Sequence, residues 1–504
     1  MFAGLWARGF ALECRSATAL AHLSRHGSSR LLHQTLPKPT SLPSLARNRV
    51  PAWSTLSAFR KNGLWSPSRH LALRAGGSAP RRAFDPRFFS SNAAEIPASE
   101  LPVLSPPAVG GWLVASAVLV FAVIVVGGVT RLTESGLSIT EWRPIAGVLP
   151  PLTRAEWEEE FNKYKATPEF KLLNHSISLS EFKDIFYMEW GHRVLGRLIG
   201  VGFVVPLAYF ALRKRLTATL PRHLFGMALL IGAQGALGWY MVKSGLEDSL
   251  METPGAVPRV SQYRLAAHLG TAFVLYAGMF YTGLATIADW RYANKGWWSG
   301  LKENGSQWKE ILANPHIKKF ARNVKGLTAL VFLTALSGAF VAGLDAGLLY
   351  NEFPLMGGRL APPADELFDP AYAKNVDRSD LWWRNILENP TTVQFNHRCL
   401  AITTYVATTA LYLSARNPVL RAALPPLTRR MATGAFAMAN VQVALGICTL
   451  LYLVPISLAA MHQAGSVMLL TTMMHLLLSL RRPGAAAQAW RQAFRNAQKA
   501  ATRR

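Results

Sequence analysis

Cysteine is scarce in this chain of 504 residues, which contains only Cys14, Cys399 and Cys448. Three cysteines without a CxxC pair cannot build a disulfide framework or a thiolate metal site. Cys399 and Cys448 also lie inside long apolar segments. Any iron that the protein binds is therefore held by residues other than cysteine.

Acidic residues are also few. The chain has 28 Asp and Glu against 54 Lys and Arg, a net charge of +26. Such a balance can indicate a nucleic-acid partner. However, much of the excess lies in residues 1–94, where twelve Arg and two Lys face only Glu13 and Asp85. Because nearly half of the net positive charge lies in this one terminal segment, nucleic acid is not the expected partner.

The N-terminal segment is rich in Arg and Ser and poor in acid, which is typical of a mitochondrial transit peptide. The run Arg87-Phe88-Phe89-Ser90 resembles a matrix processing site, which predicts that residues 1–89 are a disordered leader removed near Ser90. The alternative is a disordered basic arm that is kept.

Long apolar segments dominate the rest of the chain. A helix of about 20 apolar residues crosses the hydrocarbon core of a bilayer. The sequence therefore predicts an all-α membrane protein with eight transmembrane helices, whose partner is the lipid bilayer. The predicted spans are 111–131, 191–212, 223–243, 264–286, 324–344, 396–414, 430–453 and 457–480.

Charge in the connecting segments predicts the orientation. Connections 213–222 and 415–429 are basic, as is the tail 481–504, whereas the long connections 132–190 and 345–394 are rich in acid. Basic connections stay on the side of synthesis or import. We therefore expect a multi-pass protein of the mitochondrial inner membrane with both termini in the matrix. The linker 291–323 would also face the matrix.

The chain also repeats itself. Gly127–Leu137 resembles Ser337–Leu348, and Gln234–Gly238 resembles Gln442–Gly446. Self-similarity at matching places indicates repeated structural units. The sequence predicts two tandem four-helix bundles, related by internal duplication. They cover residues 106–290 and 324–480.

Four histidines lie near the starts of even-numbered spans: His192 and His268 in the first half, His397 and His462 in the second. An imidazole in hydrocarbon is costly unless it has a partner. A single such histidine is more often a hydrogen-bonded packing residue. Two facing pairs in a doubled helical bundle are what two haems would need.

The two halves differ beside their first histidine. Glu189 precedes His192 by three residues, whereas Gln394 precedes His397. Residues three apart share a helix face, and a carboxylate can take up a proton or stabilise positive charge while an amide cannot titrate. This favours a reactive first site and an electron-transfer second site. The alternative for Glu189 is a solvated carboxylate at the membrane boundary.

Arginines and tryptophans near the predicted sites have two interpretations each. The arginines could pair with haem propionates or anchor helices at the membrane interface. The tryptophans could form an interfacial belt or a lid over the haem faces. The arginines are Arg131, Arg193 and Arg398, and the tryptophans are Trp142, Trp157, Trp382 and Trp383.

From about Pro106 to Leu480 the chain resembles the mitochondrial haem A synthases, the Cox15 and CtaA family. The resemblance rests on two four-helix repeats, the run Gly127–Ser138 and the motif Glu189-x-x-His192-Arg193. Bacterial members often carry a cysteine pair in the first outer loop, which residues 132–190 lack. A disulfide or thiol step in that loop is therefore excluded.

The resemblance implies an oxidoreductase acting on a CH group, which converts the C8 methyl of haem O to the formyl of haem A for cytochrome c oxidase. It implies that haem O binds between His192 and His268, that haem b binds between His397 and His462, and that Glu189 is catalytic.

The expected partners are a ferredoxin-type electron donor in the matrix and a haem O synthase. A homo-oligomer stays open. Two other functions would use the same histidines. One is a diheme b-type cytochrome that carries electrons, for example from a quinol, and the other is a haem-handling protein without chemistry of its own.

Overall fold

The structure is a computed structural model that describes residues 101–143, 148–247, 258–302 and 307–502. All of them belong to one compact unit, Asp85–Arg504. The predicted leader, residues 1–89, lies outside the described residues.

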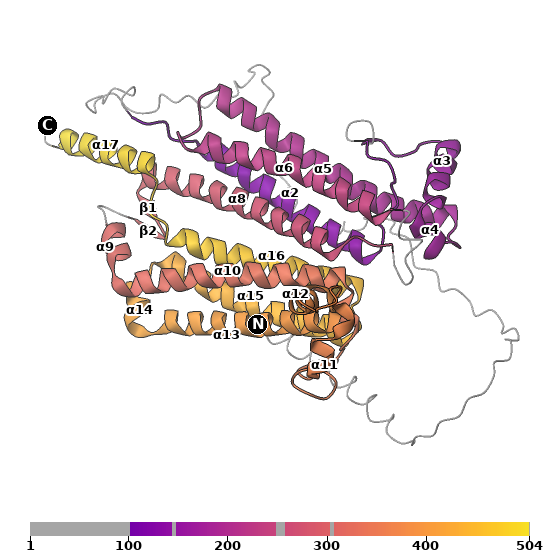
Figure 1. Cartoon of the computed structure of the whole chain (residues 1–504). Coiled ribbons are helices and arrows are strands. Elements are labelled where there is room, and N and C mark those ends of the chain that lie inside the picture. The colour runs from indigo at the N-terminus through magenta and orange to yellow at the C-terminus, as the bar shows by residue number, and fades with distance from the viewer. Residues whose placement is uncertain (1–100, 144–147, 248–257, 303–306, 503–504) are drawn as a thin grey trace, which may run out of the picture. The chain divides into compact units, whose positions relative to one another are not determined.

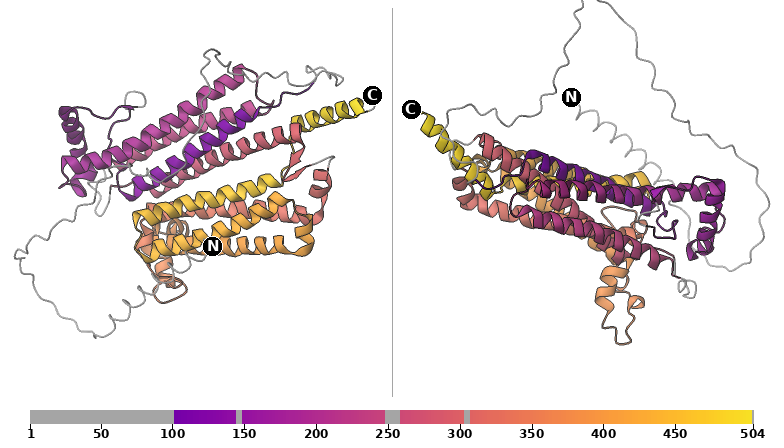
Figure 2. Two further views of the ribbon diagram at one scale, coloured as in Figure 1. Left: turned by 180° about the vertical axis from the view of Figure 1, so that it is seen from behind. Right: turned by 90° about the horizontal axis from the view of Figure 1, so that it is seen from above.

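Eight long helices run side by side in this unit (Figures 1 and 2). Each coincides with one predicted apolar segment, although most extend beyond it. The helices are α2 (Pro107–Leu132), α5 (Leu179–Leu212), α6 (Leu220–Gly245), α8 (Gln262–Lys295), α10 (Pro315–Gly343), α13 (Pro390–Arg416), α15 (Pro426–Leu451) and α16 (Ile456–Ser479).

Six of these helices are long and apolar enough to cross a membrane, among the residues described. The two others, α13 and α16, contain His397-Arg398 and His462-Gln463, which lower their hydropathy. The protein is therefore an all-α membrane protein. Eight spans remain a prediction.

Local capping sets where helix α5 begins. The Ser178 side chain accepts a hydrogen bond from the backbone N–H of Glu181, and the Glu181 carboxylate accepts one from the backbone N–H of Ser178 at 2.8 Å. This reciprocal capping box satisfies two donors at the helix start. Helix α5 thus starts at Leu179, well before the predicted span 191–212. The prediction that His192 lies near a helix start is wrong, because it lies inside α5.

The eight helices form two groups of four. Helices α2, α5, α6 and α8 surround one hydrophobic core, and α10, α13, α15 and α16 surround another. Helices α2 and α8 of the first group contact α16 of the second, and α8 also contacts α10. Across this contact, the Gln463 amide donates to the carbonyl oxygen of Ile124 at 3.1 Å. The Tyr276 and Thr471 hydroxyls lie 2.6 Å apart.

The connection 132–190 folds into a small aromatic unit on the end of α5. It contains α3 (Arg154–Lys165) and α4 (Pro168–Leu172), whose aromatic rings pack against Phe182 and Phe186. Trp157 lies in this cluster and is only 5% exposed. The prediction of a belt or lid is therefore wrong for Trp157. By contrast, Trp142, Trp382 and Trp383 are exposed.

The connection 345–394 consists of short helical segments. Its last segment leads into α13, whose first turn is capped by the Asn389 side chain. The segments are η2 (Ala346–Leu348), α11 (Ala364–Leu367), η3 (Pro370–Tyr372) and α12 (Leu381–Glu388).

The opposite end of the unit is also structured. The linker predicted at 291–323 contains a hairpin of β1 (Trp297–Trp298) and β2 (Leu301–Lys302), followed by α9 (Gln307–Ala313). The basic tail forms α17 (Ala485–Thr502), which packs on α8. Arg481 anchors this tail, because its guanidinium donates to both carboxylate oxygens of Asp289 at 2.7 and 3.0 Å.

Helices α2 and α8 cross at two glycines. A β-carbon placed on Gly283 would lie 2.9 Å from the carbonyl oxygen of Gly110, closer than van der Waals contact allows. Small residues at a crossing let helix backbones approach in membrane proteins. This crossing holds together the first and last helices of the first half.

We expect Gly283→Ala to force α2 and α8 apart and to destabilise the protein by about 1–3 kcal/mol. Gly111→Ala is the matched control, because no atom lies within 4 Å of its added β-carbon. Thermal unfolding in detergent would measure both variants. Equal melting temperatures for the two would contradict the assigned crossing.

Candidate functional site

Each of the four predicted histidines lies against a glycine of the preceding long helix. A β-carbon on Gly127 would lie 2.9 Å from Nε2 of His192, and one on Gly446 would lie 2.8 Å from Cε1 of His462. Gly238 and Gly338 face His268 and His397 at 3.6 and 3.4 Å. The odd-numbered predicted helices therefore supply the glycines and the even-numbered ones supply the imidazoles.

The histidines come together as the predicted pairs. His192 and His268 are close enough to interact electrostatically, as are His397 and His462. Among the residues described, no three His, Cys, Asp or Glu side chains gather as they would around a bare metal ion. A pair of imidazoles suits a metal whose other positions are filled by a porphyrin.

The ring nitrogens of the second pair are partly held by neighbouring side chains. The Ser337 hydroxyl lies 2.7 Å from Nδ1 of His397, and the Gln442 amide nitrogen lies 3.1 Å from Nδ1 of His462. In the described part of the chain, neither Nε2 forms a hydrogen bond. Because the Ser337 hydroxyl donates to the carbonyl oxygen of Thr334, it accepts from Nδ1–H of His397 and leaves Nε2 of that ring for a metal. The Gln442 amide nitrogen can only donate, so it does not orient His462 in this way. This donor set fits a haem.

The first pair has fewer such partners. Nδ1 of His268 is buried without a hydrogen-bond partner in the described residues. The Gln234 amide instead donates to the backbone carbonyl of His268 at 3.2 Å, and the Gln442 amide donates to that of His462 at 2.9 Å. A glutamine at the matching position therefore supports the second histidine of each half. The ring nitrogens of the first pair are left available to a ligand.

Glu189 lies three residues before His192 on α5, and its side chain is 3% exposed. Among the described residues, it is the only carboxylate that forms hydrogen bonds next to a histidine pair. One carboxylate oxygen accepts from the Ser138 hydroxyl at 2.7 Å and from the backbone N–H of Ile139 at 2.8 Å. The other accepts from Arg193 at 2.7 and 3.0 Å. The alternative of a solvated carboxylate is therefore wrong. Glu189 joins α5 to the connection 132–190.

Arg193 and Arg398 occupy matching positions. The guanidinium of Arg193 donates to the carbonyl oxygens of Ile139 and Glu141, and that of Arg398 donates to those of Tyr350 and Leu355. Both arginines therefore tie a helix to the long connection before it. Only Arg193 also has a carboxylate partner on its own helix.

Gln394 and Arg131 are likewise engaged with the protein. The Gln394 amide donates to the carbonyl oxygen of Tyr350 at 3.3 Å, but its own oxygen is buried without a partner. Arg131 forms an ion pair with Asp345 at 3.0 Å, which links the two halves. The predicted propionate contacts of the arginines stay predictions.

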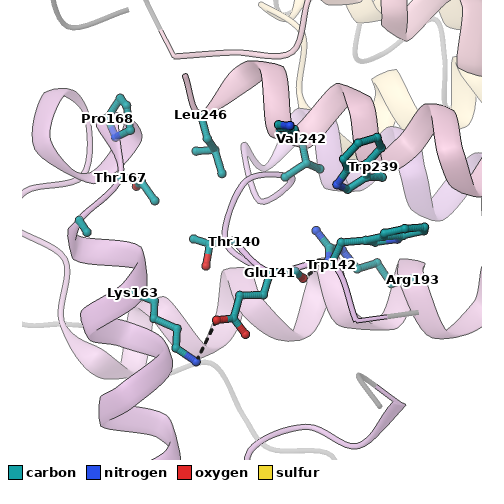
Figure 3. A pocket seen from close by; sticks show the side chains of 12 residues that line it. Thr140, Glu141, Trp142, Lys163, Thr167, Pro168, Arg193, Trp239, Val242 and Leu246 are labelled. Carbon is teal, nitrogen blue, oxygen red and sulfur yellow. Dashed lines mark hydrogen bonds and ion pairs between the residues drawn. The ribbon is translucent and has the colours of Figure 1, made fainter. Parts of the chain in front are cut away.

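A cavity of about 500 Å³ lies between the connection 132–190 and helices α5 and α6 of the first half. Figure 3 shows that Trp142 and Trp239 lie over one side of it, with Lys163 across from them. Trp239 follows Gly238, which packs on His268, and Arg193 also lines the cavity. Two of its lining residues, Arg193 and Trp239, are thus next in the chain to His192 and to the glycine that packs on His268. Arg193 and Trp142 are the lining residues that the sequence analysis had singled out.

Glu169 is a second buried carboxylate, which the sequence interpretation missed. It lies on α4 and is 4% exposed, and one of its oxygens has no hydrogen-bond partner among the described residues. Burial raises its pKa to about 8, and the nearby negative charges of Glu189 and Glu134 add to the rise. No spacing in the sequence distinguishes Glu169 from the many exposed acids around it.

The fold and site define a class: an all-α membrane protein whose two helical groups each hold a pair of partly buried histidines. The family model COX15-CtaA, described as "Cytochrome oxidase assembly protein", matches residues 110–474. The chain belongs to this family.

Three relatives show how far the similarity extends. The chain is 43% identical to heme A synthase COX15 of Saccharomyces cerevisiae, over 92% of this chain and 91% of the relative. It is 45% identical to heme A synthase COX15 of Homo sapiens, over 74% and 83%. It is 48% identical to a heme A synthase-mitochondrial ferredoxin fusion protein of Schizosaccharomyces pombe, over 72% and 58%.

Because folding raises the pKa of Glu169 from its ordinary value of 4.5 to about 8, the folded protein favours the neutral acid. The stability that this carboxyl contributes is fully present below about pH 4.5 and is lost as the pH rises through 8. We expect Glu169→Gln to flatten the fall in melting temperature between about pH 5 and 9. Glu158→Gln, at an exposed glutamate of α3, is the control. An unchanged pH profile for Glu169→Gln would contradict the assignment.

Proposed function

We propose that this chain is a haem A synthase, an oxidoreductase that converts the C8 methyl of haem O to the formyl of haem A for cytochrome c oxidase. The observation that carries the proposal is that the chain belongs to this family and holds two pairs of partly buried histidines. Only the first pair has a buried carboxylate, Glu189, three residues before one of its histidines. The names of the relatives do not support the alternative of a diheme electron carrier.

The proposed architecture is eight transmembrane helices in two duplicated four-helix bundles, residues 106–290 and 324–480. Matched contacts support the duplication, because each half presents a glycine to both of its histidines. In each half, too, a glutamine donates to the backbone of the second histidine. The repeated sequence motifs predict these same positions.

The substrate haem O is assigned to His192 and His268, and a haem b cofactor to His397 and His462. When bound, haem b supplies an iron that passes single electrons to the substrate site. His397 suits this role, because the Ser337 hydroxyl accepts from its Nδ1–H and leaves Nε2 for the iron. The Gln442 amide holds the helix at His462 through the backbone carbonyl of that residue. Arg131, Arg193 and Arg398 are the proposed propionate contacts, and two of them retain a buried Nε without a partner in the described chain.

Glu189 is the proposed catalytic residue. Four hydrogen bonds hold its carboxylate in place, so its charge is positioned before substrate arrives. A preorganised carboxylate can stabilise positive charge that develops in a reaction, or accept a proton. Two successive hydroxylations of one methyl give a geminal diol, which loses water to the aldehyde. Each hydroxylation replaces one C–H bond by a C–O bond. It balances with dioxygen as the oxidant and with two electrons from the ferredoxin and two protons, which reduce the second oxygen atom to water. Glu189 would transfer one of these protons or stabilise positive charge at the reacting carbon.

The proposed location is the mitochondrial inner membrane, with both termini, the linker and the basic tail in the matrix. The basic connections support this orientation. A matrix ferredoxin is the proposed electron donor. The fission yeast relative is a fusion of a heme A synthase with a mitochondrial ferredoxin, which supports that partner. A haem O synthase would deliver the substrate.

We expect Glu189→Gln to lower haem A production by about 100-fold or more, within the usual range for loss of an acid–base group. The amide can still accept from Ser138 and Ile139, so the fold should persist. The variant would be expressed in cells that depend on this chain, and extracted haems identified by mass. Gln394→Asn, at the matching position of the other half, is the control. Full haem A production by Glu189→Gln would exclude the catalytic role.

Substitution of one histidine in each pair separates the two sites. We expect His462→Ala to lose haem b while it still binds haem O, and His268→Ala to lose haem O while it keeps haem b. Haems extracted from the purified variants and identified by mass would decide between the sites. If both variants lost the same haem, the assignment of the pairs would be wrong.

A further inference from the structure

A second cavity, of about 560 Å³, lies at the end of the second half that is opposite its long connection. It is lined by α13, by the short helix α14 (Pro418–Ala423) and by the start of α15. Four arginines line it and no acidic side chain does. They are Arg416, Arg421, Arg429 and Arg430.

These arginines have few partners within the protein. Arg416 donates to the Tyr412 hydroxyl at 2.8 Å. In the part of the chain that the structure describes, the guanidinium groups of Arg421, Arg429 and Arg430 have neither an ion pair nor a hydrogen bond. All four arginines are exposed. Such a concentration of unpaired positive charge in one cavity favours an anionic ligand.

Two of these arginines lie at an electrostatically unfavourable position. Arg429 and Arg430 lie at the start of α15, whose first turn has no acidic residue. The partial positive charge of a helix N-terminus disfavours cations there. An anion in the cavity would offset the repulsion among the arginines and the helix end.

An apolar surface continues from this cavity. Ile402, Val406 and Leu413 of α13 are 53–59% exposed, and their spacing puts them on one face of the helix. Tyr412, at the cavity, stacks on Phe436 of α15 with ring centroids 4.4 Å apart. A bilayer covers such an apolar face. A ligand with a phosphate and long acyl chains therefore matches the cavity and the face together.

We propose that this cavity binds the phosphate headgroup of an anionic phospholipid, whose acyl chains lie along the exposed apolar face of α13. Basic pockets between membrane helices bind such headgroups when they lie at the basic side of the membrane. The bound lipid would bridge α13, which carries His397, and α15, which carries the glycine packed on His462. It would thus stabilise the second half. The inference is independent of the reaction proposed above.

The test uses the full chain, purified in detergent and delipidated. Binding of dioleoylphosphatidylglycerol would be measured by native mass spectrometry, with dioleoylphosphatidylcholine as the neutral comparison. One basic residue near an anionic lipid contributes roughly fivefold in affinity, so Arg429→Gln with Arg430→Gln should weaken binding roughly 30-fold. The control is Lys214→Gln with Arg215→Gln, an equal charge change at exposed residues of the other half.

The proposal is supported if binding of the anionic lipid weakens only in the Arg429→Gln, Arg430→Gln variant. The lipid should also raise the melting temperature of the parent and of the control but not of that variant. Equal loss in both variants would overturn it, because it would show a response to net charge alone. Inorganic phosphate that binds as tightly as the lipid would also overturn it in favour of a free-anion site. If the double variant does not fold, Arg421→Gln on the exposed helix α14 gives the same test, with roughly fivefold weaker binding expected.

Discussion

The close approach of an imidazole to a glycine backbone is the contact on which this structure depends. Four histidines lie within an apolar bundle, each in contact with a glycine position of a neighbouring helix. At Gly127 and Gly446 the imidazole occupies the space that a β-carbon would fill. The glycines are thus needed for space and not for unusual backbone angles. This requirement pairs α2 with α5, α6 with α8, α10 with α13 and α15 with α16, and each of these pairs is in contact. It also explains why glycines recur in both repeats of the chain.

One scaffold therefore serves two sites with different charge. In both halves an arginine ties the helix of the first histidine to the carbonyls of the preceding long connection. Only the first half adds a buried carboxylate, Glu189, which also bonds that connection. Removing one partner of a buried ion pair is costly. The first connection is consequently tied to the helix of its first histidine by more side-chain bonds than the second, and Arg193 also lines the cavity next to it.

Helices and candidate ligands were predictable because both depend on local sequence. Eight apolar segments coincide with eight helices, and the histidine pairs and the Glu189–Gln394 difference follow from repeated motifs. The start of α5 was missed because the helix begins at a capping box in a polar part of the sequence, where hydropathy does not indicate a membrane helix. Trp157 was misassigned because a tryptophan in a belt and one in a small aromatic core have the same local sequence signal. The Asp345 partner of Arg131 and the carbonyl partners of Arg193 lie more than 50 residues away, where a local pattern carries no information.

The sequence by itself determined the all-α membrane class and the positions of the apolar helices, and it predicted the repeats and the candidate ligands, since hydropathy and self-similarity are properties of order along the chain. Only the tertiary structure decided what surrounds those ligands. It placed a glycine against each imidazole, bonded Glu189 to Arg193 and the first connection, buried Glu169, and gathered four arginines in one cavity. Such contacts depend on the distance and orientation between helices, and packing sets these only when the whole bundle forms.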